Sequence, residues 1–291
     1  MTHLIVSEAP HIHGKLTTRG VMLNVLIALM PAVVAVTVIN GLRALLVVAV
    51  SVACCAAFEY ICCIIFKRKS AALDLSACVT GVILALTLPA TIPLWQVAGG
   101  AFAAIVIAKQ AFGGIGKNAL NPAAMARLLM GLIFSGSFKF YALDGISRVT
   151  TLGLLLGVYT NTIIGVYATA LLLGAAFLVV RRIITWEAPV FFTAAATLAA
   201  FALGNASVST VLSGGILLAA CFMATDTVTS PLTFWGRVIY AALGGAAAVL
   251  LKRFYGNGDD GIYLAILLIN IASPLLDYLT HPRALGAPSR R

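Results

Sequence analysis

Apolar runs of the length needed to cross a lipid bilayer follow one another along almost all of this 291-residue chain. A helical crossing takes about 20 apolar residues, and each run is bounded by Gly, Pro or charged residues. The runs are too long and too evenly apolar for barrel strands, so we expect helices, which satisfy their backbone groups internally. We predict ten helices, at residues 21–40, 42–66, 73–90, 94–112, 122–134, 155–180, 187–204, 208–224, 236–251 and 262–279.

The composition excludes an ordinary soluble enzyme. Hydrophobic residues make up 62% of the chain and charged residues only 10%, whereas about a quarter of the residues in a soluble domain are charged. The predicted helices leave no separate soluble domain of useful size. We therefore expect an all-α polytopic membrane protein.

The net charge of +10 is explained by membrane topology, because cytoplasmic loops carry an excess of Lys and Arg. If the N-terminus is cytoplasmic, most of the 19 Lys and Arg residues fall on the inner side. Both termini are therefore expected in the cytoplasm, and the polar stretch 139–151 outside. No basic patch with interleaved aromatic residues indicates a nucleic-acid partner. The outer basic residues are Arg43, Lys139, Arg148, Lys252 and Arg253.

Short sequence matches recur in the same order in the two halves of the chain. Residues 80–84 match 213–217, and 99–101 match 244–246. Chance recurrence of Gly and Leu is one explanation. The other is a repeat of five helices, and an odd number of crossings gives the two copies inverted orientations. The expected organisation is a cytoplasmic segment 1–20, a first repeat 21–151 with an outer loop 136–151, a second repeat 152–280 and a cytoplasmic tail 281–291.

Each half interrupts a helix with a Thr- and Pro-containing segment, at 86–93 and at 224–231. Pro cannot continue a helix cleanly. The helix at 122–134 is also too short, at about 1.5 Å per residue, for a core about 30 Å thick. Irregular backbone at that depth is tolerated where it lines a cavity or is buried in protein. The fold alone therefore indicates a transporter or a membrane subunit that holds a cofactor.

The expected outer loop contains Asp144, Ser147 and Thr150 at intervals of three residues. By itself this pattern is explained by helix entry, with Thr150 or Thr151 as N-cap and Asp144 in a turn. The spacing also resembles the flavinylation motif of bacterial redox membrane proteins, in which a flavin transferase links FMN to the final Thr through a phosphoester. That resemblance implies covalent FMN on Thr150, on the side of the membrane where the transferase acts.

Two further segments, Phe-Gly-Gly-Ile-Gly-Lys-Asn-Ala-Leu-Asn-Pro-Ala at 112–123 and Met-Ala-Thr-Asp-Thr-Val-Thr-Ser-Pro at 223–231, resemble signatures of the NqrB/RnfD family. Segments 7–13, 86–89 and 270–277 are similar to the same family. The resemblance implies a multi-pass subunit in a bacterial cell membrane. Its complex would couple electron transfer between ferredoxin and NAD to Na+ or H+ translocation, and catalysis would belong to the whole complex.

The same resemblance implies the cofactors and partners. The cofactors are FMN on Thr150 and a second, non-covalent flavin such as riboflavin. The partners are the other Rnf subunits, A, B, C, E and G, and the flavin transferase. The alternative is a secondary transporter or channel with inverted repeats and no redox role.

Three further residues are candidates for cofactor binding. Asn121 precedes Pro122 and is expected to cap a helix start, where exposed amides can hold an anion such as a flavin phosphate. Glycines at 113, 114 and 116 allow left-handed backbone just before it. Thr225 and Asp226 lie at a membrane boundary, where an acid is a candidate for an ion or for flavin hydrogen bonds. Ordinary turns explain both segments equally well.

Glu59 lies within a predicted helix and either pairs with Lys67 or Arg68 or marks an ion path. The six cysteines are expected to be small apolar core residues, because an iron–sulfur cluster needs four converging thiolates. No pair of histidines has metal-binding spacing on a helix, so we expect no metal site.

Overall fold

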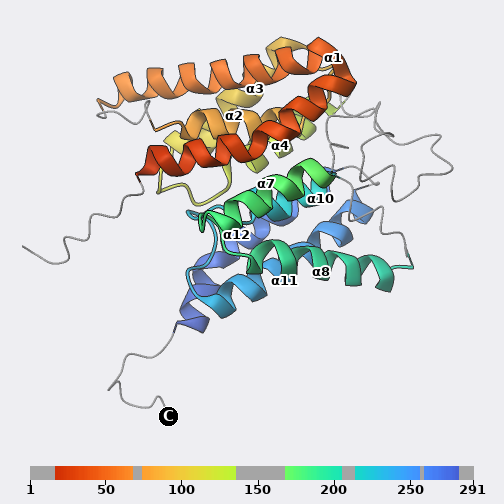
Figure 1. Ribbon diagram of the computed structural model, residues 1–291. Helices are drawn as coiled ribbons and strands as arrows, with labels where there is room; N and C mark the ends of the chain where they lie inside the picture. The colour runs from red at the N-terminus through yellow and green to blue at the C-terminus, as the bar shows by residue number, and fades with distance from the viewer. Residues whose placement is uncertain (1–16, 68–73, 136–167, 205–213, 256–258, 282–291) are drawn as a thin grey trace, which may run out of the picture.

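The computed structural model describes residues 17–67, 74–135, 168–204, 214–255 and 259–281, and every regular element in these ranges is helical. This confirms the all-α prediction for the part of the chain that the structure describes. Figure 1 shows the arrangement. The elements are α1 (Thr18–Ile65), α2 (Ser76–Leu86), α3 (Leu94–Phe102), η2 (Ala103–Gln110), α4 (Pro122–Ile133), α7 (Ala168–Val180), α8 (Glu187–Ala202), α10 (Gly214–Leu218), η5 (Ala219–Met223), α11 (Phe234–Phe254) and α12 (Asp260–Thr280).

Three helices, α1, α11 and α12, are long and apolar enough to cross a membrane, judged by length and composition. The remaining helical stretches of ten residues or more are also apolar. Large hydrophobic side chains such as Leu42, Leu173 and Phe254 are exposed on the outside of the fold. Apolar surface of this kind is suited to lipid, and it supports a membrane-embedded protein.

The predicted helices 21–40 and 42–66 are the two arms of α1, an element of 48 residues. Gly41 interrupts it with a non-helical backbone at φ 70° and ψ −170°, a region that residues with a Cβ rarely adopt. The chain doubles back at this point, and the two arms of α1 diverge from the bend as a V in Figure 1. The sequence correctly placed the two helical segments, and the structure shows that a single glycine separates them.

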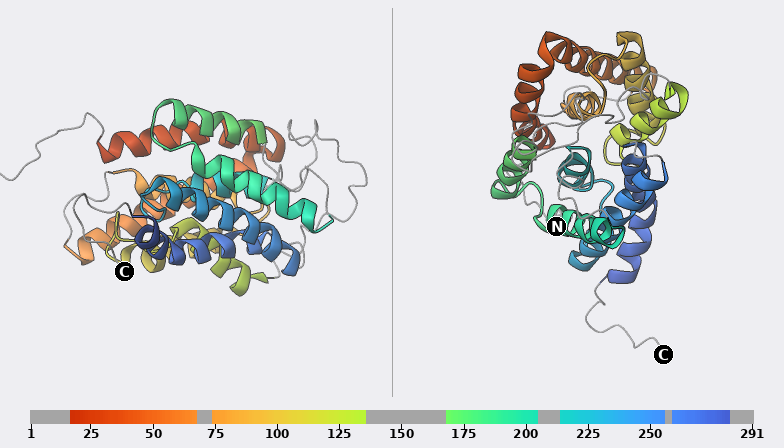
Figure 2. Two further views of the ribbon diagram at one scale, coloured as in Figure 1. Left: turned by 90° about the horizontal axis from the view of Figure 1, so that it is seen from below. Right: turned by 90° about the vertical axis from the view of Figure 1, so that its right-hand side faces the viewer.

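The two short helices, α2 and α10 with its continuation η5, lie inside the fold. Figure 2 shows each of them surrounded by the other helices of its own half. Nearly every side chain of α2 is buried, and so are those of residues 215–224. The irregular segment after α2 is buried too, with Thr87 and Leu88 fully covered. Protein therefore covers the irregular backbone expected at the end of α2.

Glycines within the matching segments allow helix backbones to touch. Ser51 Oγ donates to the Gly81 carbonyl at 2.8 Å, and a Cβ on Gly81 would lie 2.8 Å from Val52 Cα. A Cβ on Gly245 would collide with the Phe192 carbonyl oxygen. Small residues commonly mark such close contacts between membrane helices. The sequence matches thus fall at helix-packing positions in both halves.

The half formed by α1–α4 and the half formed by α7–α12 meet along two seams. In one, α1 packs against α7, and in the other, α4 packs against α12. Within the second half, α11 packs against both α8 and α12. The irregular segments that follow η2 and η5 lie between these seams, and they form the site described next.

Candidate functional site

A pocket of about 110 Å³ lies between the two halves. The first half contributes the start of α1, one side of α2 and the segment that follows η2, while the second contributes the end of α7 and the segment that follows η5. Two sets of side chains line it. The apolar set includes Val21, Met22, Val25, Val79, Ile83, Leu178, Ile184 and Phe222, and the polar set includes Ser76, Thr80, Lys109, Asn118, Asn121, Thr225, Asp226 and Thr227.

Three of the predicted cofactor-binding residues line this one pocket: Asn121 from the first half, and Thr225 and Asp226 from the second. The sequence positions of the two segments differ by more than 100 residues, so the contact between them is a product of the fold. The other three predicted residues, Asp144, Ser147 and Thr150, lie outside the described residues.

Asn121 caps α4 as its sequence predicts. Its Oδ1 accepts from the Ala123 and Ala124 N–H groups at 3.1 and 3.2 Å, and Pro122 occupies the first turn. The glycines at 113, 114 and 116 just before it have φ of 118°, 92° and 79°, which confirms the predicted left-handed backbone. The cap uses the acceptor oxygen of Asn121, while its Nδ2 donates across the pocket to the Met223 carbonyl at 3.5 Å.

Asn121 also fixes where α4 begins relative to the length of α12. When the Asn270 amide is oriented to satisfy its hydrogen bonds, its oxygen accepts from the Asn121 N–H at 2.9 Å and its nitrogen donates to Tyr240 Oη at 2.6 Å. Asn270 is the central residue of the 21-residue helix α12. Thus α4 begins, and η5 ends, beside the middle of a helix that is long enough to cross a membrane.

On the opposite wall, the segment after η5 holds Thr225 and Asp226. Thr225 Oγ1 donates to the Cys221 carbonyl at 2.7 Å, which ties the segment back to the last turn of η5. Asp226 Oδ1 accepts from the Val228 N–H at 3.2 Å, an arrangement in which an Asp side chain stabilises a turn of its own backbone. Asp226 therefore does have a turn-forming role, and it also lines the pocket.

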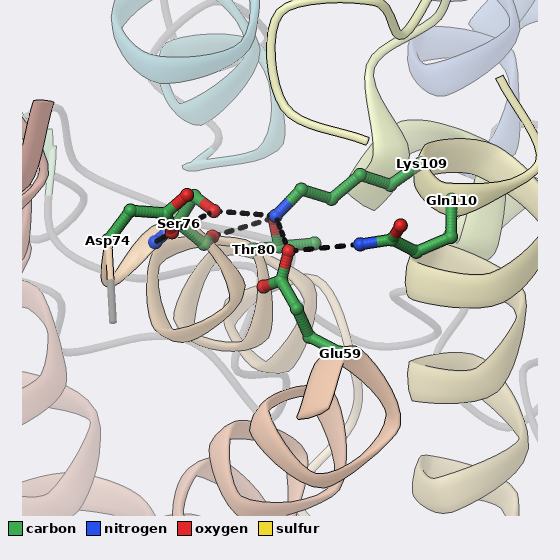
Figure 3. Close-up of polar contacts among 6 residues, drawn as sticks. All are labelled: Glu59, Asp74, Ser76, Thr80, Lys109 and Gln110. Carbon is green, nitrogen blue, oxygen red and sulfur yellow. Dashed lines mark hydrogen bonds and ion pairs between the residues drawn. The ribbon is translucent and has the colours of Figure 1, made fainter. Parts of the chain in front are cut away.

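A buried ion pair joins Lys109, which lines the pocket, to Glu59 of α1 (Figure 3). Lys109 Nζ lies 2.5 Å from Glu59 Oε1, and the two side chains are 4% and 1% exposed. Gln110 Nε2 donates to the same oxygen at 3.2 Å. The predicted pairing of Glu59 with Lys67 is wrong, because the packing of η2 against α1 brings Lys109 to Glu59 instead. Arg68, the other predicted partner, lies outside the described residues.

The network continues from Lys109 to the start of α2. Lys109 Nζ donates to Ser76 Oγ at 2.5 Å, and Ser76 Oγ donates to Asp74 Oδ1 at 2.6 Å. Leu75, between them, has a left-handed backbone at φ 64°, a strained conformation that clusters at functional sites. Since Lys109 and Ser76 both line the pocket, this network connects the pocket to the buried carboxylate of Glu59.

The sequence did not reveal Lys109 as a site residue. Its partner is 50 positions away, and the π-helical turns of η2 aim both Lys109 and Gln110 at Glu59. Such turns often occur at functional sites, but no residue pattern in this sequence predicts them. The available signal was a lysine near the end of a long apolar run.

A second ion pair lies away from the pocket. Arg127 on α4 is 3% exposed, and its guanidinium lies 2.6 Å from Asp260 Oδ1 at the start of α12. Arg127 also lies over the Tyr263 ring at 5.3 Å and donates from Nε to the Thr87 carbonyl at 3.1 Å. This arginine therefore ties α4, α12 and the irregular segment after α2 together.

The pocket lining suits a flat ligand that has one apolar and one polar edge. Aliphatic side chains and Phe222 form one part of the wall, and an ammonium, two amides, a carboxyl and several hydroxyls form another. A flavin ring has the matching character, with a dimethylbenzene edge and a pyrimidine edge that carries carbonyl acceptors and an N–H donor. Pockets of this type hold ligands through apolar contact and orient them through a few polar groups.

The described residues thus define a helical membrane protein with a polar pocket between its halves. The chain belongs to the NQR2, RnfD, RnfE family, whose profile matches residues 5–286.

Three relatives match the chain over nearly their full length. It is 36% identical to the D subunit of the Na+-translocating ferredoxin:NAD+ oxidoreductase complex of Acetobacterium woodii, over 98% of this chain and 96% of the relative. It is 30% identical to the D subunit of the proton-translocating ferredoxin:NAD+ oxidoreductase complex of Clostridium ljungdahlii, over 97% and 96%. It is 31% identical to the D subunit of the ion-translocating oxidoreductase complex of Methanosarcina acetivorans, over 98% of both.

Proposed function

We propose that this chain is the D subunit of an Rnf-type complex that couples electron transfer between ferredoxin and NAD to translocation of Na+ or H+. The observation that carries this proposal is the end-to-end similarity to D subunits of complexes with that activity. Catalysis belongs to the complex, in which the other Rnf subunits, A, B, C, E and G, are the partners.

We further propose that the chain holds two flavins. One is FMN, attached by a flavin transferase to Thr150 in an outer loop that also contains Asp144 and Ser147. The other is a non-covalent flavin such as riboflavin, in the pocket between the halves. A bound flavin supplies reversible electron transfer, while the protein sets its position and electrostatic surroundings.

In the pocket, Asn118, Thr225 and Asp226 provide hydrogen-bonding groups for the polar edge of the ring, and the aliphatic wall contacts the other edge. Asn121 holds the two irregular segments together through Met223 and Asn270. Its role is to keep the opposing walls at a fixed separation. Asn118 and Asn121 are buried, and Thr225 and Asp226 are half-buried, which limits the access of water to this edge of the ligand.

The proposed topology has ten membrane helices in two inverted five-helix repeats, with both termini in the cytoplasm. The central positions of α2 and of α10 with η5, each enclosed by its own half in Figure 2, support it. The doubled-back α1 supports it as well, because its two arms supply two of the crossings.

Covalent attachment is tested by Thr150→Ala in cells that contain the transferase. After denaturing electrophoresis, the unmodified chain should give a band with flavin fluorescence and the variant should give none. Thr151→Ala is the matched control and should keep the fluorescence. A dark band from the unmodified chain would favour a transporter without a redox role, and fluorescence that persists in Thr150→Ala would move the acceptor to Thr151.

A further inference from the structure

Lys109 both lines the pocket and forms a buried ion pair. Among the described residues that line the pocket it carries the only cationic side chain, and its ammonium also pairs with Glu59 at 2.5 Å. It donates to Ser76 as well, which is itself held by Asp74. One cation is thus shared between a buried carboxylate and the space that a ligand would occupy.

Because Lys109 and Glu59 are buried, their charges should interact strongly with each other and with a ligand. Charge interactions strengthen away from water, and a buried ion whose partner is removed is strongly destabilised. Negative charge on a ligand edge beside Lys109 would be stabilised by its ammonium. Glu59 pairs with the same ammonium, and its own negative charge would oppose that stabilisation.

We propose that Lys109 is the ligand-binding cation that makes this pocket prefer the anionic form of its ligand, and that Glu59 is a positioning residue that moderates this preference. The inference rests on the proposed flavin pocket. For riboflavin, the two forms differ by two electrons and one proton: the oxidised ring is neutral, and the ring that has gained them carries one negative charge at its pyrimidine edge. Lys109 should therefore shift the relative affinity of the pocket toward the reduced ring.

The two residues predict opposite shifts. Lys109→Met removes the stabilising cation, so the ratio of affinities for reduced over oxidised riboflavin should fall about tenfold. Glu59→Gln removes the competing anion, so the same ratio should rise. A tenfold change corresponds to about 30 mV in a two-electron midpoint potential. A merely structural pair would loosen the pocket in both variants and would give no such opposition of sign.

The experiment uses the purified full-length chain with Thr150→Ala, so that added riboflavin is the flavin observed. Its midpoint potential is measured by titration with dithionite against indicator dyes. Lys109→Met should shift the potential downward and Glu59→Gln upward, while Lys109→Arg should stay near the parent value. Lys117→Met is the matched control, since Lys117 is exposed in the segment before Asn121 and should cause no shift.

Lys109→Met leaves Glu59 buried without its cation, so that variant alone can fail to fold. The double variant Glu59→Gln/Lys109→Met removes both charges, and its potential should also lie below the parent value. Bound riboflavin with unchanged potentials, or with shifts of the same sign in Lys109→Met and Glu59→Gln, would overturn the role of Lys109 and leave the flavin pocket intact. Failure of the parent chain to bind riboflavin would overturn the pocket and this inference with it.

Discussion

Charged residues inside this fold pair over long sequence distances. Lys109 pairs with Glu59, and Arg127 pairs with Asp260. Asn121 could be recognised as a helix cap because Asn followed by Pro is a local signal. The ion pairs could not be recognised in that way, since each depends on which helices pack together. Lys109 and Arg127 also show that not every basic residue of this chain records membrane topology.

Loss of the carboxylate that pairs with Arg127 should destabilise the fold. Asp260→Asn removes the negative charge beside a buried guanidinium, and we expect the free energy of unfolding to fall by about 2 kcal/mol. Thermal unfolding of the chain in detergent measures the change. The matched control is Asp259→Asn, the neighbouring acid, whose pairing with Lys252 is more exposed on the cation side and should contribute below about 1 kcal/mol. Equal losses in the two variants would contradict the structural role of Arg127.

At the scale of elements, the apolar runs predicted that helices would form in these segments, but they predicted less well the residues at which the helices begin and end. The run 94–112 corresponds to α3 and η2 over 94–110, whereas 73–90 contains only the 11-residue α2. The shortening follows from the Thr- and Pro-containing segment after Leu86, which the sequence does show. The π-helical turns in η2 and η5 were not predictable, because their geometry follows from what the helix packs against.

Two glycines in the matching segments allow a test of helix packing, with one Gly-to-Ala substitution at each. Gly245→Ala would place a methyl group against the Phe192 carbonyl, so α11 must move away from α8, at a cost of about 2 kcal/mol. Gly99→Ala would meet only Phe134 at 3.9 Å and should be neutral or stabilising, since Ala favours helix over Gly. Unfolding temperatures of the two variants in detergent should therefore change in opposite directions or by clearly different amounts. A harmless Gly245→Ala would disprove the close contact.

Across the whole molecule, the two halves share the pocket, and neither half alone encloses it. Sequence signals marked both of its irregular walls, at Asn121 and at Thr225 and Asp226. They did not show that these walls face each other, because that contact arises from the seams α1–α7 and α4–α12. The sequence also did not mark Lys109 and Ser76 as lining residues, because their position at the pocket depends on how η2 and α2 pack.

Topology can be tested by labelling single cysteines in a chain whose six native cysteines are replaced. Ala142→Cys in the expected outer loop should react with an impermeant thiol reagent added to intact cells. Thr185→Cys lies in the exposed turn between α7 and α8, on the expected cytoplasmic side, and should react only after lysis. The reverse pattern would refute the outer location of Thr150.

The beginning of α4 beside the middle of α12 has an electrical consequence. In the proposed topology, a charge that moves from the cytoplasmic surface to the level of Asn121 crosses about half of the hydrocarbon layer. A full crossing is worth about 2.3 kcal/mol per 100 mV of membrane voltage, so this half is worth about 1.2 kcal/mol. Loading of the pocket with charge would then depend on the voltage across the cell membrane.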